Sequence, residues 1–171
     1  GTNDDAINKK VKMLRDYGRQ DRYEHKIKGY NSRLDTMQAV VLAAKLKHLD
    51  KWNKMRNTHA NYYCQLLKKV PGVTFPTVKD KRTHVFQTFA VRVPNRDKIC
   101  EGMKKKGVSV LIHYPIPIHL QQAYSDLGGK KGDFPVSEKI AGEILSLPMF
   151  PHMSKKQIEH VCSSLKELCN G

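Results

Sequence analysis

The fold class follows from residues 85–112, which read VFQTFAVRVPNRDKICEGMKKKGVSVLI. Apolar residues alternate with a more mixed set along 85–93, which predicts a strand with one buried face. Pro94-Asn95 opens the helix that follows, and Gly107 ends it. The apolar run over 108–112 predicts a second strand. A strand, a helix and a strand within one short stretch predict the core of a small α/β domain.

Upstream of this core, the sequence predicts one long helix over residues 34–70. Apolar and aromatic residues recur there at steps of three and four, the sequence from Ser32 to Asp35 resembles a capping box, and Pro71-Gly72 ends the pattern. The stripe consists of Leu34, Met37, Val41, Ala44, His48, Trp52, Met55, His59, Tyr62 and Leu66. We interpret it, histidines included, as core packing rather than a ligand site.

The remaining elements are shorter. A small amphipathic helix is expected within 4–17 and a loop over 18–33. Downstream, 135–145 is expected to be helical, while 113–119 and 147–151 carry prolines that favour rigid, extended segments. Ser154 and Gln157 form a capping box for a last helix, whose apolar face carries Ile158, Val161, Leu165 and Leu168.

Charge and composition restrict the function classes. The chain has 171 residues and a net charge of +15, and residues 1–110 hold 25 basic and 10 acidic side chains. Such a field attracts polyanions, so nucleic acid is a possible partner, but no nucleic-acid-binding motif is present. No apolar run is long enough to span a bilayer, and no secretory pattern precedes the first helix. We expect a cytoplasmic protein that does not bind membranes.

The four cysteines, Cys64, Cys100, Cys162 and Cys169, lack zinc-site spacing. We therefore expect free thiols and no metal site.

Two groups of residues could bind a ligand. Asn31, Ser32 and Arg33 precede the long helix, where unpaired N–H groups and side-chain donors suit a phosphate. The alternative is that Asn31 or Ser32 only caps the helix and Arg33 is a surface charge. The second group lies within 113–119, HYPIPIH, where imidazoles, a phenol and prolines after a strand indicate a pocket wall.

Several motifs in order resemble the DegT/StrS-type sugar aminotransferases. Residues 29–39 match G-x-N-x-R-L-D-x-x-Q-A, residues 113–121 match H-Y-x-x-P-x-H-x-Q, and residues 147–151 match L-P-x-x-P. Residues 14–18 are similar to the family's L-R-x-x-G segment. The resemblance covers nearly the whole chain and matches the C-terminal portion of the family.

This resemblance implies an α/β fold, namely the C-terminal small domain of a fold-type-I pyridoxal phosphate (PLP) enzyme. We expect a small, mostly antiparallel sheet with packed helices and one long connecting helix. Residues 1–33 would be a remnant of the large domain with an active-site loop, 34–70 the connecting helix, and 71–171 the small domain.

The resemblance also implies roles for single residues. Asn31 would bind the phosphate of PLP held by the neighbouring subunit of a homodimer. A nucleotide-sugar substrate would be contacted by Arg33, His113, Tyr114 and His119, with His25 and Tyr30 as further candidates.

The expected reaction moves an amino group from glutamate onto a nucleoside-diphosphate keto-sugar. In the family, the lysine that forms the Schiff base with PLP lies upstream of the matched region. No lysine here takes its place, so we expect the isolated chain to be inactive. The alternative is a free-standing, non-catalytic binding or regulatory domain derived from the family.

Overall fold

The computed structural model describes residues 1–170, which form two compact units: Gly1–Leu49, and the chain from Asp50 onward.

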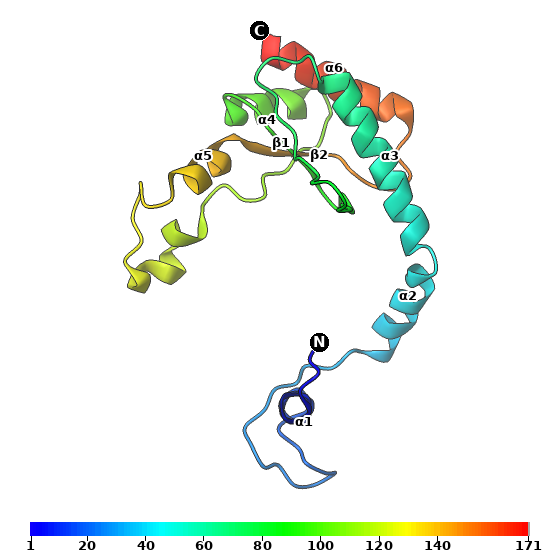
Figure 1. Cartoon of the computed structure of the whole chain (residues 1–171), viewed down its shortest axis with the longest axis vertical. Coiled ribbons are helices and arrows are strands. Elements are labelled where there is room, and N and C mark those ends of the chain that lie inside the picture. The colour runs from blue at the N-terminus through cyan, green and yellow to red at the C-terminus, as the bar shows by residue number, and fades with distance from the viewer. Residues whose placement is uncertain (171) are drawn as a thin grey trace. The chain divides into compact units, whose positions relative to one another are not determined.

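A small antiparallel sheet forms the centre of the second unit (Figure 1). Strand β1 (Phe89–Arg92) pairs with strand β2 (Ile144–Leu147), with Phe89 opposite Leu147 and Arg92 opposite Ile144. Single antiparallel bridges extend it on both sides, from Thr74 to Arg92 and from Leu111 to Ser146. The predicted strand over 108–112 is therefore reduced to the single bridge at Leu111, because it lies at the edge of the sheet.

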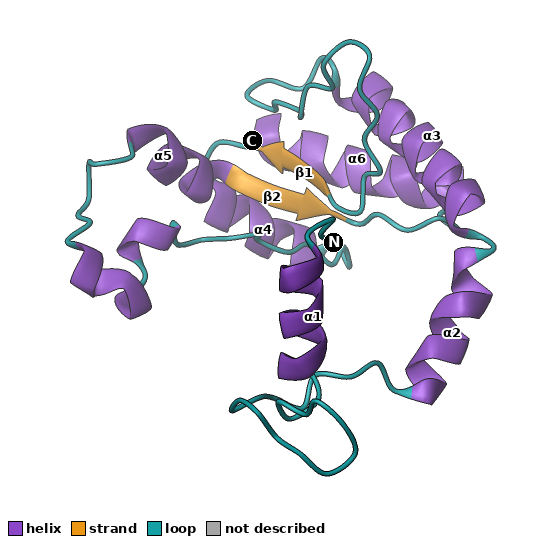
Figure 2. Ribbon diagram, turned by 60° about the horizontal axis from the view of Figure 1, so that its bottom comes forward, coloured by secondary structure: helices purple, strands orange, loops and turns teal. Residues whose placement is uncertain are grey.

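Helices surround this sheet. They are α3 (Leu49–Leu67), α4 (Arg96–Lys105), α5 (Pro135–Glu143) and α6 (Lys155–Asn170), with two 3₁₀ segments, η1 (Ile118–Leu120) and η2 (Gln122–Leu127). Figure 2 shows α3, α4 and α6 gathered around the two strands. Gly102 permits the close approach of α4 to α6, since a Cβ there would lie 2.6 Å from Leu168 Cδ2.

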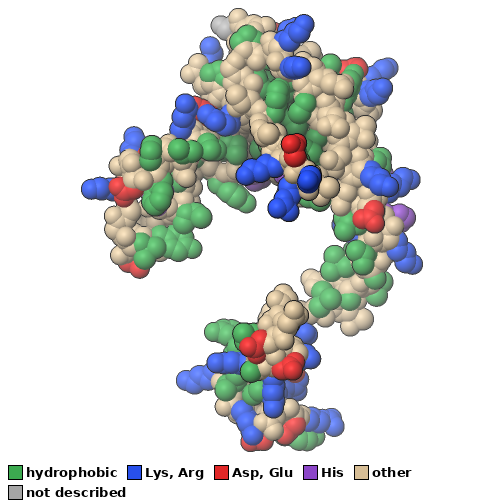
Figure 3. All heavy atoms as spheres, viewed as in Figure 1, with side chains coloured by type: hydrophobic (Ala, Val, Ile, Leu, Met, Phe, Trp, Pro, Cys, Tyr) green, Lys and Arg blue, Asp and Glu red, His purple; other side chains and the backbone are tan. Residues whose placement is uncertain are grey.

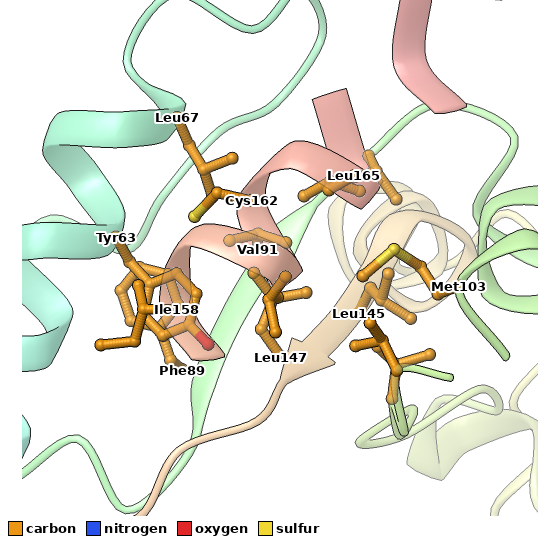
Figure 4. Packing of buried hydrophobic residues seen from close by; sticks show 14 of the residues in the cluster. Tyr63, Leu67, Phe89, Val91, Met103, Leu145, Leu147, Ile158, Cys162 and Leu165 are labelled. Carbon is orange, nitrogen blue, oxygen red and sulfur yellow. The ribbon is translucent and has the colours of Figure 1, made fainter. Parts of the chain in front are cut away.

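The core lies between the sheet and these helices (Figure 4). Its largest fully buried side chains are those of Tyr63, Phe89, Leu67, Met103, Leu145, Ile158, Leu165, Val91 and Val93. The rings of Tyr63 and Phe89 stack at a centroid distance of 4.9 Å. The hydroxyl of Tyr63 donates to the carbonyl of Pro148 at 2.9 Å, which satisfies its only polar atom inside the core.

The local signals for α4 and α6 are confirmed. Gly107, which follows α4, has a φ of +76°, a conformation that glycine adopts without a steric penalty. Before α6, the backbone N–H of Ser154 donates to Gln157 Oε1 at 2.8 Å, and the N–H of Gln157 donates to Ser154 Oγ at 3.3 Å. This reciprocal pair is the predicted capping box.

The prediction of one helix over 34–70 is wrong. Helix α2 (Thr36–Leu46) ends at a turn over Lys47 and His48, and α3 begins at Leu49. The cap of α2 is Asp35, whose carboxylate accepts from the N–H of Met37 at 2.9 Å, and not Ser32. Apolar periodicity continues across the turn, so the pattern alone did not reveal the break.

The predicted apolar stripe is also misplaced in α3. The buried residues of this helix are Ala60, Tyr63 and Leu67, one position beyond His59, Tyr62 and Leu66. The sheet and α6 determine which face of α3 is covered, and this information is absent from the period of the helix itself.

The first unit consists of α1 (Asp5–Leu14), a loop and α2. The carboxylate of Asp4 caps α1 by accepting from the N–H of Ile7 at 3.0 Å. Neither α1 nor α2 contains a buried residue, and the side chain of Met37 is 80% exposed. Figure 3 shows hydrophobic side chains at the surface along α2. A helix as apolar as α2 is normally covered in a folded protein.

None of the helices within residues 1–170 has the length and hydrophobicity needed to cross a bilayer. In the same residues, His, Cys, Asp and Glu side chains do not gather in groups of three or more that could hold a metal ion. All four cysteines are free thiols, as predicted.

Candidate functional site

A cavity of about 650 Å³ lies in the second unit, along the chain from His113 to Ile144. Residues 113–119 leave the edge of the sheet next to Leu111, η1 and η2 follow, and α5 closes the cavity on its return to β2. The lining is mainly apolar and aromatic: His113, Tyr114, Ile116, Pro117, Ile118, His119, Tyr124, Leu127, Gly129, Phe134, Ser137, Ile140, Ala141 and Ile144.

The first histidine of the cavity is held by the sheet. His113 Nδ1 lies 2.9 Å from the hydroxyl of Ser146, a buried residue in the middle of β2. The ring of Tyr114 meets that of His113 edge to face at 5.4 Å, and the Tyr114 side chain is 73% exposed. The sheet therefore anchors an imidazole beside a phenol that an incoming ligand can reach.

The second histidine is held by helix α5. His119 Nε2 lies 3.1 Å from Glu138 Oε1, and the ring centroids of His119 and Phe134 are 4.8 Å apart. The backbone of His119 also packs against Gly129, where a Cβ would lie 2.8 Å from the His119 carbonyl oxygen. The imidazole of His119 is thus enclosed by α5 and by the 129–134 turn.

Glu138 has further partners. Its Oε1 accepts from the backbone N–H of Gly132 at 2.8 Å and from that of Phe134 at 3.4 Å. The Gly132 bond is the main cause that lowers the pKa of Glu138, with contributions from His119 and from Phe134. Since the ionised carboxylate is the better acceptor, this arrangement favours the charged form of Glu138.

Backbone hydrogen bonds fix the loop of the first unit next to Asn31. Asp16 and Asn31 form an antiparallel bridge, and the N–H of Ser32 donates to the carbonyl of Arg15 at 2.9 Å. Gly18, at a φ of +74°, allows a close approach, because a Cβ there would lie 1.7 Å from the carbonyl oxygen of Ile27. No other residue type fits this position without moving the loop.

Arg33 orients Asn31. Its Nε donates to Asn31 Oδ1 at 3.2 Å, and its guanidinium lies 5.4 Å from the centroid of the Tyr17 ring. With Oδ1 engaged in this way, Asn31 presents its amide N–H groups beside a cation. Asp16 Oδ1 lies 3.8 Å from Arg33 and offsets part of the charge. Amide and guanidinium donors together suit a phosphate group.

The further candidates belong to the same loop. His25 Nδ1 lies 2.9 Å from the carbonyl oxygen of Tyr17, so this imidazole braces the loop. The side chain of Tyr30 is exposed, while its backbone N–H donates to the carbonyl of Leu14 at 2.7 Å.

The structure brings His113, Tyr114 and His119 together around one cavity, and it brings Asn31 and Arg33 into contact in the other unit. The sequence analysis missed Ser146 and Glu138, because each lies far along the chain from the histidine that it holds. It also missed Tyr124 and Phe134, whose aromatic rings in an otherwise polar stretch were an available signal.

Comparisons with known proteins agree with this architecture. The model of the DegT/DnrJ/EryC1/StrS aminotransferase family matches residues 1–166. The chain is 46% identical over 165 residues to the erythromycin biosynthesis sensory transduction protein EryC1 of Saccharopolyspora erythraea, which covers 96% of the chain and 45% of that protein. It is 38% identical over 166 residues to the dTDP-3-amino-3,4,6-trideoxy-alpha-D-glucose transaminase of Streptomyces venezuelae, covering 97% of the chain and 44% of that enzyme.

A solved structure has the same fold. It is DesV of S. venezuelae in complex with a ketimine intermediate, with a TM-score of 0.93 and 37% identity over 99% of this chain and 46% of that one. The expected fold class, part of a PLP aminotransferase with a small antiparallel sheet, is confirmed. The chain spans about 45% of the length of these relatives. It therefore belongs to the DegT/DnrJ/EryC1/StrS aminotransferase family, of which it corresponds to the C-terminal portion.

Proposed function

We propose that this chain acts as the C-terminal portion of a PLP-dependent aminotransferase that transfers an amino group from glutamate to a nucleoside-diphosphate keto-sugar. The family match over residues 1–166 is the observation that carries the proposal. In this proposal, residues 1–33 belong to the large domain, 34–70 connect the domains, and 71–171 form the small domain. The uncovered apolar surface of α1 and α2 supports that division, because the large domain would cover it.

Asn31 and Arg33 are the residues that would hold PLP in this chain. We place the amide N–H groups of Asn31 on the phosphate of PLP bound by the neighbouring subunit of a homodimer. Arg33 fixes the orientation of that amide and supplies positive charge. When bound, PLP supplies the electron sink that amino-group transfer requires, while the protein supplies orientation and electrostatics.

His113, Tyr114 and His119 would contact the nucleotide sugar, together with Arg33. The cavity supports this role because apolar and aromatic walls combine with a few polar groups, as is typical of small-molecule sites. The net charge of +15 favours a substrate that carries a diphosphate. The S. venezuelae relative is named for a dTDP-linked amino sugar, which supports a nucleoside diphosphate as the carrier.

The test is a fusion of this chain to the N-terminal part of the S. venezuelae transaminase, with PLP, glutamate and a dTDP-3-keto-sugar. We expect amino-sugar formation by the fusion, and none by the 171-residue chain alone, in which we assign no lysine to the Schiff base. Asn31→Ala should weaken PLP retention, whereas Glu143→Gln, whose partner Arg92 lies outside the cavity, serves as a matched control. A fusion that retains PLP but forms no amino sugar would contradict the proposal.

The second candidate is a non-catalytic binding or regulatory domain. It is favoured by the S. erythraea relative, which is named as a sensory transduction protein. Both candidates allow the chain by itself to bind a nucleotide sugar, but the second predicts that the fusion produces no amino sugar.

A further inference from the structure

We propose that Glu138 is a positioning residue that holds His119 in a single tautomer and ties the 129–134 turn to helix α5. This inference rests on the proposed function only where it assigns the cavity to a nucleotide sugar. The geometry on which it depends belongs entirely to the second unit.

A single carboxylate oxygen of Glu138, Oε1, contacts His119, Gly132 and Phe134. Glu138 Oε1 lies 3.1 Å from His119 Nε2, 2.8 Å from the N–H of Gly132 and 3.4 Å from the N–H of Phe134. The side chains of His119 and Glu138 are only 11% and 17% exposed, so water competes little for the bond between them. The carboxylate thus links α5, the turn and the imidazole at one point.

An ionised carboxylate can only accept hydrogen bonds. His119 Nε2 must therefore carry the hydrogen in this contact, and Nδ1 becomes the acceptor nitrogen of the neutral ring. The lowered pKa of Glu138 keeps the carboxylate charged at neutral pH. A ligand group that donates a hydrogen bond, such as a sugar hydroxyl, is the matching partner for Nδ1.

His113 is held differently. Its Nδ1 partner is the hydroxyl of Ser146, which can either donate or accept. Ser146 therefore fixes the place of the His113 ring but leaves its tautomer open. Of these two contacts, only the one between Glu138 and His119 determines both the position of the ring and the nitrogen that carries the hydrogen.

The experiment measures ¹⁵N chemical shifts of the His119 ring and amide hydrogen exchange in the 171-residue chain at pH 8. We expect the wild type to show the Nε2–H tautomer and protected amides at Gly132 and Phe134. Glu138→Ala should give a mixture of tautomers and speed exchange at both amides by about tenfold or more. Glu138→Gln should restore both signals, because the backbone N–H groups of Gly132 and Phe134 hold its carbonyl oxygen, and not its NH2 group, at the position of Oε1.

Glu143→Gln is the matched control, since Glu143 lies on the same helix and is paired with Arg92. It should leave the His119 signals and both amides unchanged. Unaltered tautomer and protection in Glu138→Ala would overturn the inference. If Glu138→Ala fails to fold, Glu138→Gln decides alone: a mixed tautomer in that folded variant would overturn the inference.

Binding of dTDP-glucose separates this inference from the proposed function. We expect Glu138→Ala to raise the Kd about tenfold and Glu138→Gln to restore it, by analogy with the partners that orient metal-bound histidines. A wild-type chain that binds no dTDP-glucose would count against the substrate assignment. The tautomer and exchange measurements would still decide the role of Glu138.

Discussion

Replacing Arg96 by Met should destabilise the second unit more than replacing Arg92 by Met. The Arg96 side chain is 7% exposed, and its Nη1 donates to the carbonyls of Ala141 at 3.1 Å and Ile144 at 3.3 Å. These carbonyls lie where α5 ends and β2 begins. Arg96 therefore fixes the junction between α5, which lines the cavity, and strand β2.

The expected loss of unfolding free energy follows from these two hydrogen bonds. Hydrogen bonds from a charged donor contribute about 1.5–3 kcal/mol, and Met keeps the apolar stem while leaving two carbonyls without the donor. The ion pair with Asp97 adds little, since Asp97 is 83% exposed and exposed pairs contribute about 0–1 kcal/mol. We expect Arg96→Met to lower the free energy of unfolding by about 2–3 kcal/mol.

Urea denaturation followed by the fluorescence of Trp52, the single tryptophan, measures this change. With a urea slope of about 1–3 kcal/mol per M, the midpoint should fall by about 0.7–3 M. Arg92→Met is the matched control, because Arg92 pairs with Glu143 at a side-chain exposure of 40% and should change stability by less than about 1 kcal/mol. Equal midpoints for Arg96→Met and the wild type would refute the reasoning.

Three further predictions concern the rest of the chain. Burial raises the pKa of the Cys162 thiol to about 12. As pH rises, the thiol therefore ionises in the unfolded chain before it ionises in the folded chain. The contribution of the buried neutral thiol to folding stability is present below pH 9 and is lost as pH rises toward 12. Urea midpoints between pH 8 and 10.5 should fall more steeply for the wild type than for Cys162→Ala, and equal slopes would contradict this. Gly18→Ala should disorder the loop around Asn31, because its Cβ would collide with the carbonyl of Ile27; unchanged amide exchange at Ser32 would disprove it. Finally, the exposed apolar surface of α2 should make the chain self-associate or bind a hydrophobic dye, and a monodisperse monomer without a dye response would argue against an uncovered surface.

The sequence by itself determined the features that depend on neighbouring residues. The turn at Gly107 and the capping box at Ser154 are interactions within a few positions of the chain, so the residue types suffice to predict them. The motif around Asn31 identified the family for the same reason, because a motif is a local pattern.

Only the tertiary structure decided which distant segments meet. Residues 144–147 form β2 because β1 pairs with them, although the apolar run at the end of α5 is equally compatible with a helix. The buried face of α3 and the break before it depend on what packs against the helix. Ser146 and Glu138 hold the two histidines of the cavity across 33 and 19 positions. No local preference encodes these contacts, because their free energy comes from burial and hydrogen bonds that exist only once the sheet and α5 are in place.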